Sequence, residues 1–205
     1  MAVDTVSTNF KLVRESDGLT VDFRPLQGLW TEEQYLKLTD QTNHFIEFTD
    51  GVIEVLPMPT DSHQVILLFL YDLLRTFLAQ IGGKVLVSPL RLQIRPGKQR
   101  EPDILLVCDA SDPRRQNRFW QGADLVAEIV SPDDPERDMV EKVADYAEAG
   151  IPEYWIVNPE AETITVLTLQ GDAYAVHGVF QRGEVANSIL LAGFNADVSA
   201  VLDAS

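Results

Sequence analysis

Two carboxylates stand at positions where the pattern of an apolar strand predicts an apolar side chain. Asp103 opens the run "DILLV" directly after Pro102, and Glu128 lies inside the run "DLVAEIV". In a strand, Val126 and Val130 would share the side of the sheet that Glu128 occupies. A buried carboxylate without a partner is strongly disfavoured. Each acid therefore requires a positive partner, which is either a cationic side chain or a metal ion.

A hard cation such as Mg²⁺ is bound by one or two carboxylates together with waters and substrate phosphates. Asp103 and Glu128, on adjacent strands, could supply those carboxylates. Such an ion stabilises charge on a phosphoryl oxygen and makes a bound water more acidic. The chemistry that this predicts is hydrolysis of a phosphate ester. The alternative is structural: Arg91 or Arg95 pairs with the buried acids, and no metal is needed.

Lys142 is the candidate cation for the same site. On a helical wheel it stands beside Tyr146 and borders an apolar face. That face comprises Val140, Val143 and Ala147. The acids expected to point to solvent are Glu141, Asp145 and Glu148. As an alternative, Lys142 could form an i, i+4 ion pair with Asp138, worth only a few tenths of a kcal/mol. In either role a border lysine should add little to stability.

Three helices are predicted around these residues. The segment "TEEQYLKL" begins with the capping-box order of Thr31 and Gln34. Leucines and valines recur at helical spacing over residues 64 to 81, a long helix that stops before Gly82. The segment "RDMVEKVADYAEAG" predicts a helix that ends at Gly150.

The segment "HFIEFTDGVIEVLPM" alternates on both sides of Asp50-Gly51, which predicts a tight hairpin. Its register pairs Glu47 with Glu54. Like charges directly across a strand pair destabilise it. On the residues alone, the simplest interpretation is two solvated glutamates that splay apart.

The remaining strands complete an α/β fold. "KVLVSPLRLQI", "DILLVC" and "DLVAEIV" predict strands, of which the last two are buried on both faces. "EYWIV" follows a helix and should join the same sheet by a crossover. The tail predicts a hairpin around a Gly-Asp turn and an edge segment "SILLAGF". We therefore expect a mixed β-sheet flanked by helices, with residues 1–28 as an N-terminal arm and residues 29–205 as one domain.

Length and composition are typical of a single globular domain. The chain has 205 residues, of which 45% are hydrophobic. Its one cysteine, Cys108, cannot form an internal disulfide, which favours a cytoplasmic location and a packing role for the thiol. The start "MAVDTVSTNF" lacks the order of a signal peptide, and Asp72 and Arg75 interrupt the most apolar stretch. No membrane segment is expected.

The net charge of −16 argues against a protein that coats nucleic acid. Eight of the 16 Lys and Arg residues nevertheless lie between positions 84 and 118, against four acids there. This basic zone consists of Lys84, Arg91, Arg95, Lys98, Arg100, Arg114, Arg115 and Arg118. It is either a surface that faces a polyanion or a solvated face that balances nearby acids.

Taken together, "EPDILLV", "DLVAEIVSP" and "EKVADYAEAGIPEYWIV" resemble the Uma-type family of putative restriction endonucleases, a branch of the PD-(D/E)XK nuclease superfamily. The resemblance extends upstream to "IEFTDGVIEVLPMPTDSHQ" and covers roughly residues 30 to 195. It implies a restriction-endonuclease-like fold. The combination of these motifs is specific, whereas a bare Pro-Asp pair would not be.

Carried over position by position, the resemblance makes Asp103 and Glu128 the metal-binding acids and Glu47 an additional acid. The superfamily pattern has a lysine two residues after the second acid, but this chain has Val130. The family resembled carries a lysine one turn ahead of a tyrosine on the next helix, which here is Lys142. His63 falls in the similar stretch, either as an auxiliary group or as a cap or packing residue.

The resemblance implies an endonuclease that uses Mg²⁺ or Mn²⁺ to hydrolyse phosphodiester bonds, with DNA as the expected partner. The competing interpretation is a non-catalytic interaction or regulatory module on the same fold, which the overall acidity and Val130 favour. The sequence contains no zinc finger or basic zipper. If the apolar strand edges at the C-terminal hairpin are exposed, they could join two copies of the chain in a homodimer. Its two identical sites could then cut the two strands of a duplex.

Overall fold

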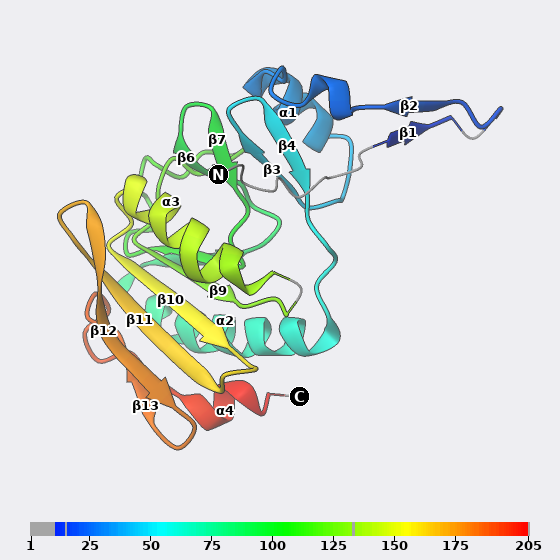
Figure 1. Ribbon diagram of the computed structural model, residues 1–205. Coiled ribbons are helices and arrows are strands. Elements are labelled where there is room, and N and C mark those ends of the chain that lie inside the picture. The colour runs from blue at the N-terminus through cyan, green and yellow to red at the C-terminus, as the bar shows by residue number, and fades with distance from the viewer. Residues whose placement is uncertain (1–10, 15, 133, 205) are drawn as a thin grey trace. The chain divides into compact units, whose positions relative to one another are not determined.

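The computed structural model describes residues 11–14, 16–132 and 134–204. These residues form two compact units. The smaller unit comprises the described residues up to Met58 together with Pro96–Gln99, and the larger comprises Pro59–Arg95 and the described residues from Arg100 onward. Figure 1 follows the elements along the chain.

The smaller unit contains two hairpins and a helix. Its elements are β1 (Lys11–Val13), β2 (Thr20–Asp22), the 3-10 helix η1 (Arg24–Leu26), α1 (Glu32–Thr39), β3 (Ile46–Thr49), β4 (Val52–Val55) and most of β7 (Lys98–Arg100). Strands β1 and β2 pair antiparallel, so the described part of the expected irregular arm holds a short hairpin. Helix α1 begins with the predicted capping box, in which Thr31 and Gln34 each accept from the other's backbone N–H.

The β3–β4 hairpin turns at Asp50 and Gly51, as predicted. Both residues have positive φ, 47° and 88°, the conformation that this turn requires. Glu47 pairs with Glu54 in the expected register. The expectation of two solvated glutamates was wrong for Glu47, which is fully buried, whereas Glu54 is partly exposed.

The larger unit is built on a six-stranded sheet with the order β12-β11-β10-β9-β8-β5. Its strands are β5 (Lys84–Val87), β8 (Ile104–Val107), β9 (Leu125–Ile129), β10 (Glu153–Asn158), β11 (Thr163–Gln170) and β12 (Ala173–Gln181). Strands β9 and β10 are parallel, and every other neighbouring pair is antiparallel. The mixed sheet is therefore confirmed, with β8 and β9 in its centre and buried along their whole length.

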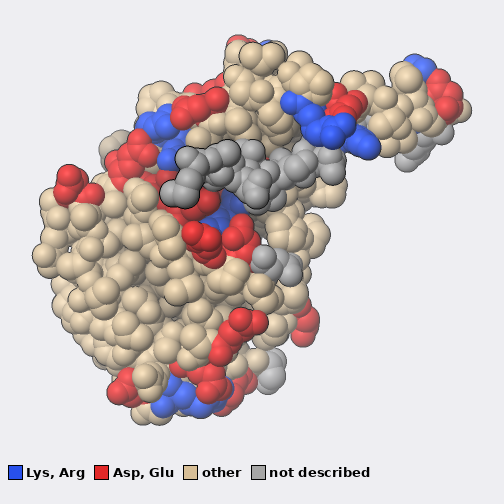
Figure 2. Space-filling model, in the orientation of Figure 1, with Lys and Arg blue, Asp and Glu red and all other residues tan. Residues whose placement is uncertain are grey.

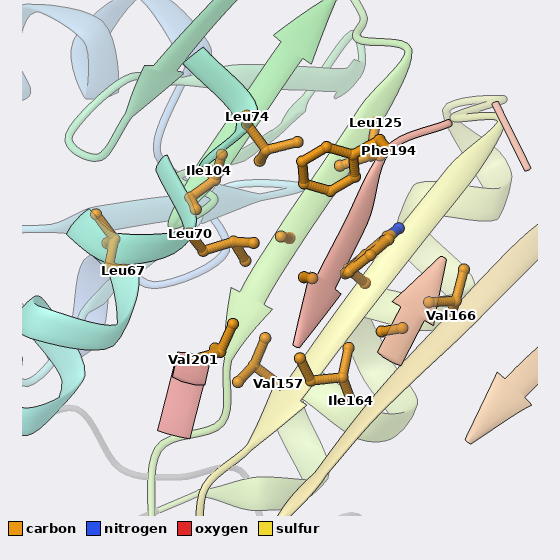
Figure 3. Close-up of a cluster of buried hydrophobic side chains, with 14 of the residues drawn as sticks. Leu67, Leu70, Leu74, Ile104, Leu125, Val157, Ile164, Val166, Phe194 and Val201 are labelled. Carbon is orange, nitrogen blue, oxygen red and sulfur yellow. The ribbon is translucent and has the colours of Figure 1, made fainter. Parts of the chain in front are cut away.

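Each face of the sheet has its own apolar core. One core contains the inward leucines of α2 (Asp61–Ile81), alternate residues of the strands, and Val198 and Val201 of α4 (Val198–Leu202) (Figure 3). The other contains Val126 and Val130 together with Tyr146 of α3 (Lys142–Glu148). Alternation along β9 thus sends Glu128, between the two valines, to the α3 face.

Helix α2 is the one described helix long and apolar enough to cross a membrane by length and composition alone. A core helix of a globular protein passes the same test. Five of its apolar side chains are buried in the core shown in Figure 3: Ile66, Leu67, Leu70, Leu74 and Leu78. The helix ends at Gly82, whose φ of 83° closes it in the left-handed conformation.

Two strand predictions need correction. The run from residue 84 to 94 is not continuous, because it divides into β5 and β6 (Leu92–Arg95) around Pro89, which cannot donate to a ladder. The segment "SILLAGF" is not an edge strand. It is a loop between β13 (Val185–Asn187) and β14 (Asn195–Asp197) that fills the core with Leu191 and Phe194.

Candidate functional site

Asp103 and Glu128 face each other across the antiparallel β8–β9 pair. The register joins Ile104 to Ala127, so Asp103 stands opposite Glu128 where β8 begins. The backbone N–H of Asp103 donates to Oε2 of Glu128 at 3.3 Å, and the N–H of Ile129 donates to Oδ2 of Asp103 at 2.8 Å. Each carboxylate is thus held by the other's strand. The predicted juxtaposition on one face of the sheet is present in the fold.

Lys142 reaches the same place from the helix. Its Nζ lies 2.9 Å from Oε1 of Glu128 and 2.9 Å from Oδ1 of Asp138. Both alternatives for this lysine therefore occur at once. All three side chains are at least 94% buried. The expectation of a border residue in weak surface pairing was wrong, because the ammonium is enclosed between two buried acids.

The orientation of the helix differs from the prediction at two positions, whereas Val143 packs against the core and Glu141 and Glu148 are exposed, as expected. Val140 is 57% exposed, although it was expected to face the core. Asp145, expected in solvent, is buried and forms a 2.6 Å ion pair with Arg100. The charges of Glu128 and Arg100 on the covered side account for this, since buried ions are tolerated only when paired. A π-helical turn, η2 (Arg137–Glu141), precedes α3, and such turns are frequent at functional sites.

Two tyrosines complete the enclosure. The hydroxyl of Tyr146 donates a short hydrogen bond to Oε1 of Glu128, the oxygen that also meets Lys142. The hydroxyl of Tyr154 donates to the backbone carbonyl of Asp138 at 2.8 Å. Burial raises the pKa of Tyr154, and the charges of Glu128 and Asp138 raise it further. The phenol therefore stays protonated and remains a donor.

His63 contacts the other acid. Thr60 caps helix α2 by accepting from the N–H of His63, which fixes the histidine in the first turn. Its Nε2 lies 3.0 Å from Oδ1 of Asp103. Both side chains are 15% exposed, so this pair is the more accessible part of the site. The histidine is thus an auxiliary group beside Asp103 as well as a residue of the cap.

The electrostatics of the site favour a cation. Asp103, Glu128 and Asp138 bring three negative charges when ionised, and Lys142 brings one positive charge, which leaves an excess of two with His63 neutral. Burial raises the pKa of Glu128 from 4.5 to about 8; Lys142 opposes this shift, while Asp103 and Asp138 add to it. The uncompensated negative charge therefore equals that of one divalent cation only when Glu128 is ionised, and a bound cation would favour that ionised form.

Two carboxylates on one face suit a hard divalent ion that takes its other ligands from water and substrate. Within the described residues, no group of three or more His, Cys, Asp or Glu side chains is placed to hold a metal together. The residues fit an ion that Asp103 and Glu128 bind and that depends on oxygen ligands from outside the chain. They do not fit a closed, all-protein cage.

Asp103, Glu128 and Lys142, three of the four residues predicted for the site, meet in the larger unit. Glu47 belongs to the smaller unit, and its role as an additional acid stays a prediction. Sequence reasoning predicted the pair of Asp138 with Lys142 as an alternative but did not assign Tyr146 a role at Glu128. The signal for Tyr146 was available, because residues 138, 142 and 146 are four apart and share one face of a helix.

The basic zone is partly neutralised by local acids. Arg95 pairs with Glu148 at 2.8 Å, and Arg114 pairs with Asp112 at 2.6 Å. Arg100 is buried and cannot act as a surface charge. If the basic zone binds a polyanion, the contact must therefore be made by its exposed residues, such as Arg118.

Similarity to known proteins covers most of the chain. Residues 32–199 match the Uma2 family, described as "Putative restriction endonuclease". Among solved structures, the fold is similar to that of a "putative nuclease belonging to DUF820" from Anabaena variabilis, with a TM-score of 0.66 at 18% sequence identity over 82% of this chain and 96% of that chain. No curated protein matches. Since the family match spans far more than half of the sequence, the chain belongs to the Uma2 family of putative restriction endonucleases.

Proposed function

We propose that this protein is a metal-dependent endonuclease that hydrolyses phosphodiester bonds in DNA. The observation that carries the proposal is the enclosed cluster of Asp103, Glu128, Asp138 and Lys142, in which three carboxylates face one ammonium. Membership of a nuclease family supports the reaction class. Mg²⁺ is the expected ion, with Mn²⁺ as a substitute of the same ligand preference.

Each residue has a distinct task in this proposal. Asp103 and Glu128 would hold the ion, which supplies charge stabilisation at the phosphoryl oxygen and a more acidic water. Lys142 lies 2.9 Å from Oε1 of Glu128 and would stabilise charge at the phosphate. Tyr146 orients Glu128 through its hydroxyl. The pair of His63 and Asp103, each 15% exposed, is the more accessible part of the site, and substrate would approach from there.

The test combines metal binding with cleavage. Isothermal titration of Mn²⁺ and Mg²⁺ into the full chain should show one site, and Asp103→Asn should abolish both the binding heat and the cleavage of plasmid DNA. Asp172→Asn, in the exposed turn between β11 and β12, is the matched control and should change neither. Equal metal affinity in wild type and Asp103→Asn would refute the proposed site.

A second candidate function is a non-catalytic interaction module, favoured by one specific observation. Val130, where the superfamily pattern has lysine, packs in an apolar core and is 6% exposed. The module would bind nucleic acid or protein without metal. Normal DNA binding with no metal heat and no cleavage would establish it instead of the nuclease.

The nuclease proposal includes a homodimer. A duplex has two strands, and a pair of identical sites related by a two-fold axis can act on both. The cytoplasmic location expected from the lone Cys108 belongs to the same proposal.

A further inference from the structure

Strand β12 is an edge strand of the large sheet, and the side chain of Asn187 in β13 lies 3.0 Å from His177 of this strand. It forms one end of the order β12-β11-β10-β9-β8-β5. Its nine residues, "AYAVHGVFQ", include no Lys, Arg, Asp, Glu or Pro. Edge strands of stable monomers are normally short, charged, interrupted by proline, bulged or covered, because an open row of N–H and C=O groups recruits another strand. Strand β12 lacks the first three protections but does carry a β-bulge.

A β-bulge concentrates apolar side chains along this edge. Val176 pairs with Leu167 and Val179 pairs with Thr165, with the register shift between these pairs. Since Leu167 and Thr165 are two residues apart on β11, they share one face, and the bulge brings both valines to that face. Val176 is 62% exposed and Val179 is 52% exposed. Two exposed valines side by side are unusual on an edge that contacts only solvent.

The surroundings of this edge carry little charge. Figure 2 shows a broad area over β10, β11 and β12 with no Lys, Arg, Asp or Glu. The whole chain has a net charge of −16, so two copies repel each other over most of their surfaces. A neutral edge is where a second copy can approach without this repulsion. A basic partner such as a DNA-bound protein would instead favour the acidic surfaces.

We propose that β12 pairs antiparallel with β12 of a second copy, which joins two six-stranded sheets into one. A strand that pairs with its own copy about a two-fold axis satisfies the same groups on both sides, so the contact closes and does not propagate. Val176 and Val179 of each copy add apolar burial at the junction. Strand β12 would thus be the interface of the homodimer that belongs to the proposed function, on which this pairing rests.

The test is the oligomeric state of the full chain. Sedimentation equilibrium should show a reversible dimer, and Val176→Lys or Val179→Lys should each weaken it by about tenfold or more, since each substitution places two like charges at the junction. Leu68→Lys is the matched control, because Leu68 is 50% exposed on α2, and it should leave the dimer unchanged. Circular dichroism verifies that each variant is folded.

Amide hydrogen exchange of the wild-type chain gives an independent reading that needs no variant. Exchange in residues 173–181 should slow as protein concentration rises, while exchange in α2 should not change. A monomer at all concentrations would overturn the proposal, as would a dimer that both lysine variants leave intact or one that protects another segment. None of these measurements uses cleavage or metal. A monomer would remove the homodimer from the proposed function but leave its metal-dependent cleavage standing, and failure of metal binding would leave the β12 pairing standing.

Discussion

Glu128 and Glu153 lie on neighbouring parallel strands and are equally buried, at 1% exposure each, but their surroundings differ. The carboxylate of Glu153 accepts from neutral donors alone: the Ser188 hydroxyl at 2.6 Å, the Trp155 indole at 2.7 Å, and the backbone N–H groups of Ile189 and Leu190 at 2.8 Å each. These donors satisfy both oxygens and join β10 to the loop before β14. Glu153 is therefore a structural carboxylate.

Glu128 is surrounded differently, since two further acids accompany its one lysine. Burying several like charges together lowers stability unless another cation joins them. The comparison teaches that burial of an acid does not by itself indicate function. The kind of partner does: neutral donors in a closed set indicate structure, and an excess of negative charge indicates a place for a cation.

The largest effect is expected at Lys142. Lys142→Met should reduce metal-dependent cleavage by about a hundredfold or more, because a positive group near the phosphate is lost. It should also lower the unfolding free energy by about 3 kcal/mol, because two buried acids lose their cation. Cleavage assays and urea unfolding measure the two effects. Adding Glu128→Gln should recover part of the stability but no activity, and a stability loss as small as that of a surface lysine would contradict the burial argument.

Glu153 should show the opposite pattern. Glu153→Ala should lower the unfolding free energy by about 2 kcal/mol or more, because four donors lose their acceptor. Metal affinity of the remaining folded protein should stay at the wild-type value. Ser188→Ala, which removes one of those donors, should cost about 1 kcal/mol. Loss of metal binding in a folded Glu153 variant would erase the distinction between the two glutamates.

Variants of His63 test how much its contact with Asp103 contributes to metal affinity. His63→Leu should weaken Mn²⁺ binding by about tenfold, as removal of a hydrogen-bond partner of a metal ligand commonly does. His63→Gln places an amide nitrogen near the position of Nε2 and should restore most of the affinity. Titration calorimetry distinguishes the two variants. Equal affinities would leave His63 as a capping residue only.

A further effect is a change in the slope of stability with pH in metal-free buffer. Because the folded-state pKa of Glu128 is raised from 4.5 to about 8, the folded chain keeps a proton between these values that the unfolded chain releases. The contribution of Glu128 to stability must therefore fall as pH rises across this window. Glu128→Gln should remove that decline, as seen in urea unfolding at several pH values. A steeper decline in the variant would show that the sign is wrong.

Local signals predicted most of the fold. The helix of α2 follows from apolar residues at helical spacing and a terminal glycine, and the hairpin at Asp50-Gly51 follows from turn chemistry. The errors lie where tertiary contacts override a local pattern. "SILLAGF" has the composition of a strand, but Glu153 draws the backbone of Ile189 and Leu190 into a loop.

The two acids of the site could be predicted from the sequence, but the burial of the helix residues that surround them could not. Asp103 and Glu128 stand out because apolar strands rarely contain carboxylates. The inward position of Asp145 did not follow from the sequence of α3, because its partner Arg100 lies 45 residues earlier in the chain. Ion pairs between residues that are distant in the sequence help to decide which face of such a helix is buried. A single sequence does not show which charged residues form those pairs.

The contacts of Glu153 have a consequence for the order of events during synthesis. A nascent chain that has completed β10 still lacks Ser188, Ile189 and Leu190, so this carboxylate has none of those three donors and cannot be buried without a large penalty. The core on the same face also awaits Phe194 and Val201. The sheet that carries Asp103 and Glu128 should therefore settle only after residues 188–201 have left the ribosome, so a shorter nascent chain would not yet present a finished site.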